Sequence, residues 1–130
     1  MKGFVTDIDA AALEGDDFRR VLYTSTYMQL VVMCIPAGGE IGLETHGQDQ
    51  FIRVEGGEGK AILDGVEHAI KDGSAVVIPA GTKHNIVNTG HGDLKLYTIY
   101  APPHHKDGVV HVTKEEAEKD EEEFLGDTTE

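Results

Sequence analysis

The residues best suited to chemistry in this chain are side chains with lone pairs that a metal ion could accept. Three of them share one short segment, Glu44-x-His46-x3-Gln50, and the fourth, His84, lies about forty residues later. Successive side chains on a strand alternate faces, so the i, i+2 spacing sends Glu44 and His46 to the same side. Gln50 would follow on the next strand after a short turn. Together these residues predict a metal site with four ligands.

His84 belongs to a segment with regular spacing, GSAVVIPAGTKHNIVN, which reads G-x5-P-x-G-x2-H-x3-N from residue 73 to residue 88. We expect Gly73, Pro79 and Gly81 to shape a turn before the strand that carries His84. Asn88 is expected to form hydrogen bonds with the backbone at the end of that strand. The glycines and the proline are therefore interpreted as structural, and His84 as the chemical residue.

The elements that position these side chains are short apolar runs separated by glycine-rich turns. We expect strands within residues 21–35, 50–57, 60–70, 74–81, 84–90 and 94–100. The Asp64-Gly65 pair predicts a hairpin, because a type I′ turn needs positive φ at both central residues. Helices do not alternate with the strands, which argues against a parallel sheet. The chain is therefore predicted to be all-β, either a sandwich or a closed barrel.

Two segments are predicted to be helical. One runs from about Ile8 to Leu13, and the other from Thr113 to Phe124. Thr113 is a candidate N-cap, and Glu116 stands three residues later, as in a capping box. The second segment is almost entirely polar, so we expect a frayed surface helix or disorder.

Two stretches, residues 38–59 and 73–88, resemble the two sequence motifs of the cupin family. The second motif matches in full. The first reads G-x5-H-x-H-x3,4-E-x6-G in the family, and here Glu44 replaces the first histidine while Gln50 replaces the glutamate. The resemblance implies a double-stranded β-helix, a jelly-roll barrel, over residues 18–103. An N-terminal extension, 1–17, would precede it, and a His-containing loop with a polar acidic tail, 104–130, helical or disordered, would follow it.

The two replacements change the donor set but keep its formal charge. The family's usual ligands are three imidazoles and one carboxylate, whereas this chain offers two imidazoles, one carboxylate and one amide oxygen. The larger share of oxygen favours iron or manganese as the single divalent metal cofactor, with nickel and zinc as alternatives. Glu44 could instead be a solvent-facing carboxylate near the barrel mouth, and Gln50 a hydrogen bonder that orients His46.

A metal site set in a wall of Ile and Val side chains predicts a small-molecule pocket. We expect a metal-dependent isomerase, lyase or dioxygenase that acts on a small oxygen-bearing metabolite such as a sugar or organic acid. Glu44 is the candidate catalytic residue, because a weakly held carboxylate could detach and take a proton as general base. The alternatives are a non-catalytic module that binds a metal or small molecule, and a structural subunit in which the polar ring has no ligand.

Charge limits the partners that this chain can have. The formal net charge is −13, from 24 acidic and 11 basic residues, which argues against a nucleic acid or an anionic membrane. The amino terminus contains acids before any apolar run long enough for a signal peptide or a membrane span, so we expect a cytoplasmic protein. The single cysteine, Cys34, cannot form an intrachain disulfide and is interpreted as a small core side chain.

A second group of histidines, His104, His105 and His111, follows the last expected strand. Adjacent side chains on an extended segment point to opposite sides, so His104 and His105 cannot readily bind one ion together. We expect a solvated loop. The alternative is a loop that folds over the barrel mouth and helps to shape a pocket.

A homodimer is expected from the resemblance, because small cupins commonly pair through edge strands or amino-terminal segments. The run QLVVMCI, residues 29–35, is apolar on both faces. It would leave one apolar face exposed in a monomer unless another layer covers it. The expected partners are therefore a small-molecule ligand and a second copy of the chain.

Overall fold

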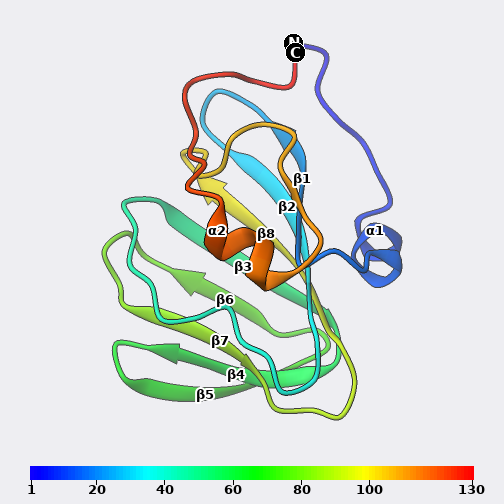
Figure 1. Cartoon of the computed structure of the whole chain (residues 1–130), viewed down its shortest axis with the longest axis vertical. Coiled ribbons are helices and arrows are strands. Elements are labelled where there is room, and N and C mark those ends of the chain that lie inside the picture. The colour runs from blue at the N-terminus through cyan, green and yellow to red at the C-terminus, as the bar shows by residue number, and fades with distance from the viewer.

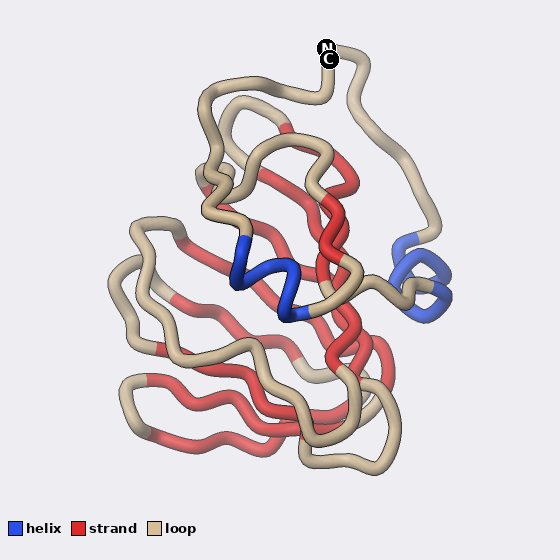
Figure 2. Tube along the Cα trace, viewed as in Figure 1, coloured by secondary structure: helices blue, strands red, loops and turns tan.

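The computed structural model describes all residues from 1 to 130 and contains two antiparallel β-sheets that pack face to face (Figures 1 and 2). The all-β prediction is confirmed. The larger sheet has the order β6-β3-β8-β2-β1-β9 and the smaller one β5-β4-β7. The strands of the larger sheet are β1 (Arg19–Thr24), β2 (Gln29–Ile35), β3 (Asp49–Gly56), β6 (Ala75–Ile78), β8 (Leu94–Ala101) and β9 (Val110–His111). Those of the smaller sheet are β4 (Glu58–Leu63), β5 (Val66–Lys71) and β7 (His84–Asn88).

Two tight turns join neighbouring strands of the sheets. Asp64 and Gly65 join β4 to β5 with φ angles of 48° and 80°, so the hairpin prediction is confirmed. The apolar run from 21 to 35 contains most of the hairpin of β1 and β2. Its turn is closed by a hydrogen bond from the Ser25 amide to the Met28 carbonyl at 2.9 Å. Polar residues at the turn interrupt a run that is otherwise uniformly β-forming.

The core lies between the two sheets and follows the alternation expected from the sequence. Ile52 and Val54 of β3 and Ile86 of β7 are fully buried, whereas Phe51 and Arg53 of β3 are half-buried on the opposite face. Burial of apolar side chains at about 25 cal/mol per Å² is the main stabilising contribution to such a barrel. The same alternation points Gln50 and His84 inward, so both reach the interior from facing sheets.

The segment between β2 and β3 carries Glu44 and His46, and it corrects one expectation. Neither residue lies in a regular strand. The segment runs antiparallel along β7 instead, with isolated bridges that pair Glu40 with Val87 and Glu44 with His84. The Glu44 amide donates to the His84 carbonyl at 2.9 Å, and the His84 amide donates to the Glu44 carbonyl at 3.0 Å. Backbone pairing therefore holds these two residues directly opposite each other.

Helix α1 (Ile8–Glu14) covers part of the outer face of the larger sheet (Figure 1). It packs against β2, β3 and β8, and its Leu13 side chain lies against Gly56. Val32 and Cys34, on the outer face of β2, are buried. The apolar face that was expected to need a partner is thus covered within the chain, and it no longer supports a dimer. Neither helix is long and apolar enough to cross a membrane.

Helix α2 (Lys114–Lys119) begins where the sequence predicts but ends five residues before Phe124. The Thr113 hydroxyl accepts a hydrogen bond from the Glu116 amide at 3.2 Å, so the expected N-cap is confirmed. The Glu116 carboxylate accepts from the Val112 amide rather than from Thr113, which is a variant of the capping box. The remaining tail continues without regular structure to a carboxyl terminus beside the amino terminus (Figures 1 and 2).

Candidate metal centre

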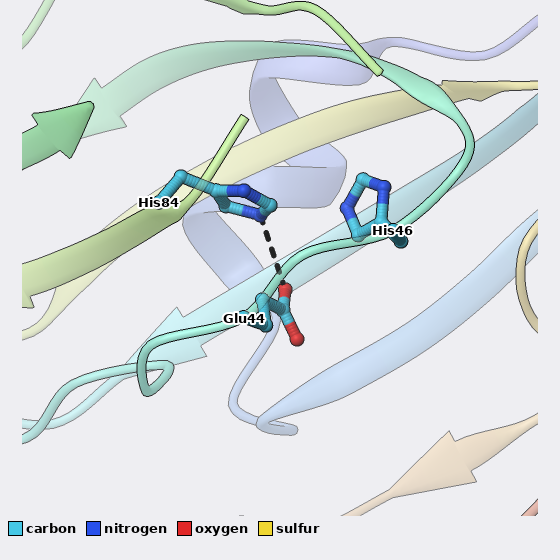
Figure 3. A group of neighbouring side chains, drawn as sticks. All are labelled: Glu44, His46 and His84. Atoms are coloured by element: carbon cyan, nitrogen blue, oxygen red, sulfur yellow. Dashed lines mark ion pairs between the residues drawn. The ribbon is translucent and has the colours of Figure 1, made fainter. Parts of the chain in front are cut away.

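Three of the residues singled out in the sequence meet at one end of the barrel. One ligand atom from each of Glu44, His46 and His84 lies within 4.8 Å of the others. Figure 3 shows both imidazole rings and the carboxylate directed toward a common point. Glu44 and His46 come from the segment that follows β2, and His84 is the first residue of β7.

Hydrogen bonds to backbone carbonyls orient both imidazoles. Nδ1 of His46 lies 3.1 Å from the Gln48 carbonyl, and Nδ1 of His84 lies 2.8 Å from the Thr82 carbonyl. A carbonyl oxygen can only accept, so each Nδ1 carries the hydrogen and donates it. Each Nε2 therefore presents a lone pair when the imidazole is neutral. Nε2 of His84 is buried and has no hydrogen-bond partner, so it could serve as a metal ligand.

Gln50 brings a fourth donor atom to the group from β3. Its amide nitrogen donates to the Thr98 hydroxyl at 3.0 Å, so its oxygen is free to face the site. That oxygen lies 3.1 Å from Nε2 of His46. When Nδ1 of His46 carries the only ring hydrogen, Nε2 of His46 and the Gln50 oxygen both present lone pairs to the same space. Such a contact is stabilised when a cation lies beside both atoms.

The spacing of the donor atoms fits one small divalent ion. Ligands bound at about 2.1 Å to one ion are about 3 Å apart when they occupy adjacent positions. Here His46 Nε2 and Gln50 Oε1 are separated by 3.1 Å, and His84 Nε2 and Glu44 Oε1 by 3.4 Å. The centroids of the two imidazole rings are 4.8 Å apart. Two imidazoles, a carboxylate and an amide oxygen are suitable donors for a first-row transition metal.

Glu44 and His84 shift each other's pKa. Burial acts to raise the pKa of Glu44, but the adjacent His84 imidazole outweighs it and holds this pKa below its usual value. Burial acts to lower the pKa of His84, but the Glu44 carboxylate and the Thr82 carbonyl raise it above its usual value. Each group thus favours the charged form of the other. The site accordingly prefers a positive charge beside Glu44.

A cavity of about 220 Å³ lies beside Glu44, between the barrel mouth and the C-terminal tail. Its lining also includes Arg19 of β1 and His104. The His104 ring packs on His46 and Tyr100, with centroid distances of 4.8 and 5.1 Å. Burial and the neighbouring His105 and His46 lower the pKa of His104 to about 4, so its imidazole is neutral near pH 7. One candidate ligand, Glu44, therefore borders a pocket that could admit a small molecule.

The prediction that the second histidine group forms a solvated loop is wrong. His105 and His111 are 5% and 3% exposed, because the tail folds back over them. Nδ1 of His105 lies 2.7 Å from the Glu122 carboxylate, and Nε2 of His111 lies 3.0 Å from the Asp120 carboxylate. Nη1 of Arg19 bonds to Nδ1 of His111 at 3.2 Å. The loop does fold over the barrel mouth, which was the alternative interpretation.

The other motif residues have structural roles. The Asn88 side chain donates to the Ile35 and Gly92 carbonyls at 2.8 and 2.9 Å, so its expected backbone bonding is confirmed. Gly57 has φ of 90°, and a Cβ there would lie 2.5 Å from the Asp93 carbonyl oxygen. Only glycine fits both that angle and that space. Gly73 and Gly81, with φ of 90° and 84°, likewise form turns.

Thr98 is a site residue that the sequence interpretation missed. It is fully buried in β8 and holds the amide of Gln50 in place. The signal was present, because Leu94, Leu96, Thr98 and Tyr100 alternate along an inward face, and a buried hydroxyl needs a polar partner.

The Cupin domain family model matches residues 31–100, which is more than half of this chain. This chain belongs to the cupin family. The matched range contains all four candidate ligands, and the two antiparallel sheets form the double-stranded β-helix of that family. The resemblance inferred from the two motifs is confirmed.

Several relatives cover most of the cupin chain. It is 43% identical over 123 residues to the uncharacterized protein YrkC of Bacillus subtilis (strain 168), covering 89% of this chain but only 66% of YrkC. The crystal structure of BH2720 from Bacillus halodurans matches with 42% identity and a TM-score of 0.90, over 92% of this chain and 96% of that one. A predicted oxalate decarboxylase from Thermotoga maritima matches with 28% identity and a TM-score of 0.57, over 59% and 68% of the chains.

Proposed function

We propose that this cupin binds one divalent transition metal through Glu44, His46, Gln50 and His84, and that it is an isomerase, lyase or dioxygenase for a small oxygen-bearing metabolite. The observation that carries the proposal is the buried Nε2 of His84, which has no hydrogen-bond partner and faces the Glu44 carboxylate at 3.4 Å. A buried polar atom without a partner is costly unless a ligand completes its environment.

The donor chemistry favours iron or manganese, because half of the donor atoms are oxygen. Four protein ligands would leave room for a substrate on a six-coordinate ion. When bound, the metal would act as a Lewis acid toward oxygen atoms of that substrate. Similarity to the predicted oxalate decarboxylase supports an organic acid over a sugar.

The protein's own groups suit proton transfer beside such a metal. Glu44 is half-buried and borders the cavity, so its carboxylate could both bind the ion and take a proton from a substrate. His46 and His84 would remain fixed, because backbone carbonyls hold their Nδ1 atoms. Tyr100 and His104 pack beside His46 and limit water at the mouth. Glu44 is therefore the proposed catalytic residue.

Metal content tests the proposal most directly. Elemental analysis of freshly purified protein should find about one divalent transition metal ion per chain. The Glu44→Ala variant should lose most of it, because the only carboxylate of the donor set is removed. Glu40→Ala is the matched control, since Glu40 lies in the same segment but is exposed and outside the group. Metal-free wild-type protein that cannot be loaded would contradict the proposal.

Turnover separates an enzyme from a binding module. Metal-loaded and metal-free protein should be assayed against a panel of oxo acids, hydroxy acids and sugars under air and under nitrogen. Metal-dependent turnover that needs air would indicate a dioxygenase, and turnover in both atmospheres would indicate an isomerase or lyase. Binding of a panel compound without turnover would favour a non-catalytic module.

We also propose that the protein is a cytoplasmic homodimer. Strand β6 is an edge of the larger sheet and carries Val77, which is 65% exposed, and an edge strand with an exposed apolar side chain suits strand pairing. A single buried cysteine, Cys34, agrees with a reducing compartment. Sedimentation at micromolar concentration should give the mass of a dimer, and a monomer alone would contradict this proposal.

A further inference from the structure

Arg19 is a buried cation without a carboxylate partner. It is 8% exposed, and none of the ion pairs of the chain includes it. Its one hydrogen bond runs from Nη1 to Nδ1 of His111, and its Nε is buried with no partner. A guanidinium has five N–H donors, so most of them are unused here. Burial of an unpaired charge is costly, which indicates that an anion belongs beside Arg19.

The cavity that Arg19 borders also contains Glu44 of the candidate metal centre. His104 and His105 line the same cavity. A small molecule in this cavity would contact the metal centre at one end and the guanidinium at the other.

The carboxylates of the tail that border the cavity already have partners of their own, and none of them forms an ion pair with Arg19. Glu122 accepts from His105 and from the Lys106 amide, Asp120 pairs with Nε2 of His111, and Glu118 lies 3.7 Å from Lys114. The His111 contacts also fix that imidazole as neutral, because Nδ1 accepts from Arg19 and Nε2–H donates to Asp120. The Arg19 charge is thus left available to a ligand.

We propose that Arg19 binds the carboxylate group of a small organic acid whose other oxygen atoms lie at the metal centre. The planar guanidinium matches a carboxylate with two parallel hydrogen bonds. A phosphate ester is disfavoured, because its second negative charge would meet the acidic tail that borders the same cavity. The cavity of about 220 Å³ is smaller than the usual range of about 300 to 1,000 Å³ for ligand sites, which indicates a compact acid.

This inference rests on the proposed metal-dependent function and names its substrate class and the residue that recognises it. Arg19 would be a substrate-binding residue, since it would touch the carboxylate and take no part in proton transfer. Its side chain is held from behind by the Phe18 ring, with the guanidinium carbon 5.4 Å from the ring centroid, and by His111. The guanidinium is therefore positioned before a ligand arrives.

Paired probes test the carboxylate directly. Protein loaded with Mn²⁺ would be titrated by calorimetry with pyruvate, 2-oxobutyrate, lactate and glycolate, each beside its methyl ester. The ester keeps the size and the other oxygen atoms but removes the negative charge. We expect wild-type protein to bind at least one acid about tenfold or more tightly than its ester.

Variants show whether Arg19 is responsible. Arg19→Gln should abolish the preference for the acid, although Gln can still donate to His111. Arg19→Lys should keep part of it, because the charge remains without the planar fork. Arg20→Gln is the matched control, since Arg20 is the adjacent arginine, is exposed and pairs with Asp17 at 2.7 Å. Equal preference in wild type and Arg19→Gln, or no preference in wild type for any acid, would overturn the inference.

Metal content measured on the same samples separates the two proposals. Normal Mn²⁺ content with an acid preference independent of Arg19 would leave the metal function intact and reject the role of Arg19. Failure of wild-type protein to take up Mn²⁺ would reject the metal function. The metal-free protein would then be titrated with the same pairs, and an acid preference lost in Arg19→Gln would still support carboxylate binding at Arg19.

Discussion

Two groups of histidines lie at the same end of the barrel and differ in the partners of their nitrogens. In the first group, His46 and His84 donate Nδ1–H to backbone carbonyls, and their Nε2 atoms face Gln50 and Glu44. In the second group, His105 and His111 bond to carboxylates of the tail. The first group therefore converges on a point that could hold a cation, and the second joins the tail to the barrel.

The comparison shows that burial of a histidine does not by itself indicate its role. His84, His105 and His111 are all buried. His105 also has an Nε2 without a partner, but His105 does not belong to the group of side chains whose ligand atoms lie close enough together to hold a metal ion. Two features distinguish a candidate ligand from a structural histidine. One is the hydrogen-bond partner of the ring nitrogen that would not bind the metal, and the other is the number of donor atoms that converge on the same position.

The largest expected effect separates the two groups by metal affinity. His84→Ala should weaken Mn²⁺ binding by more than about 100-fold, or about 2.7 kcal/mol, because it removes a donor atom, and loss of a group that only supports a ligand costs about 10- to 100-fold. His105→Ala should change the affinity by less than about threefold, since His105 is outside the donor set. Competition with a fluorescent chelator measures both, and equal losses would remove the distinction.

Metal addition should stabilise the folded protein only through the first group. At about 100 times the dissociation constant, a ligand that binds the folded state adds about 2.7 kcal/mol to the free energy of unfolding. The thermal midpoint of wild-type protein should therefore rise with Mn²⁺ and fall again with a chelator. His105→Ala should show the same rise from its own baseline, and His84→Ala should show none. A rise in His84→Ala would mean that the metal binds elsewhere.

Removal of a tail carboxylate should affect stability and leave the metal centre unchanged. Glu122→Ala deletes the acceptor of the His105 imidazole and of the Lys106 amide, at 2.7 and 2.6 Å. We expect a loss of about 2 kcal/mol in the free energy of unfolding, measured with urea, and faster proteolysis of the tail. Glu121→Ala, at an exposed neighbouring position, is the control. Unchanged stability in Glu122→Ala would show that the tail is not held by this pair.

The smallest expected effect is the pH dependence of the second group. Burial lowers the pKa of His105 below its usual 6.5, so its stabilisation is present above that pH and is lost as the pH falls toward the folded-state pKa. Burial acts to raise the pKa of Glu122, but its hydrogen bond with His105 lowers it below 4.5, so its contribution is also lost in acid. Stability should therefore decrease from pH 7.5 to pH 4.

The Glu122→Gln variant checks the sign of this dependence. Without the carboxylate, the part of the stability loss that occurs below pH 4.5 should shrink. The part of the stability loss that comes from His105 should extend to lower pH, because Glu122 raises the pKa of His105 in the wild type. Urea unfolding at pH 7.5, 5.5 and 4.0 measures both parts, and identical profiles for the two proteins would contradict the assignment.

The sequence by itself determined most of the strands, the Asp64-Gly65 hairpin and the inward face that carries Gln50 and His84, but not β9. These features are local, because alternation along a strand and the φ angles of a turn depend on neighbouring residues. The motif spacing also identified the four candidate ligands, although it placed Glu44 and His46 in a strand that is instead a bridged segment along β7.

Only the tertiary structure decided how the two histidine groups differ. Thr98, which orients Gln50, is 48 residues away in sequence, and Glu122, which binds His105, is 17 residues away. The unpaired charge of Arg19 appears only when β1, β9 and the tail are packed together. Hydrogen-bond partners and buried charges depend on contacts between distant segments, and no local pattern specifies those contacts.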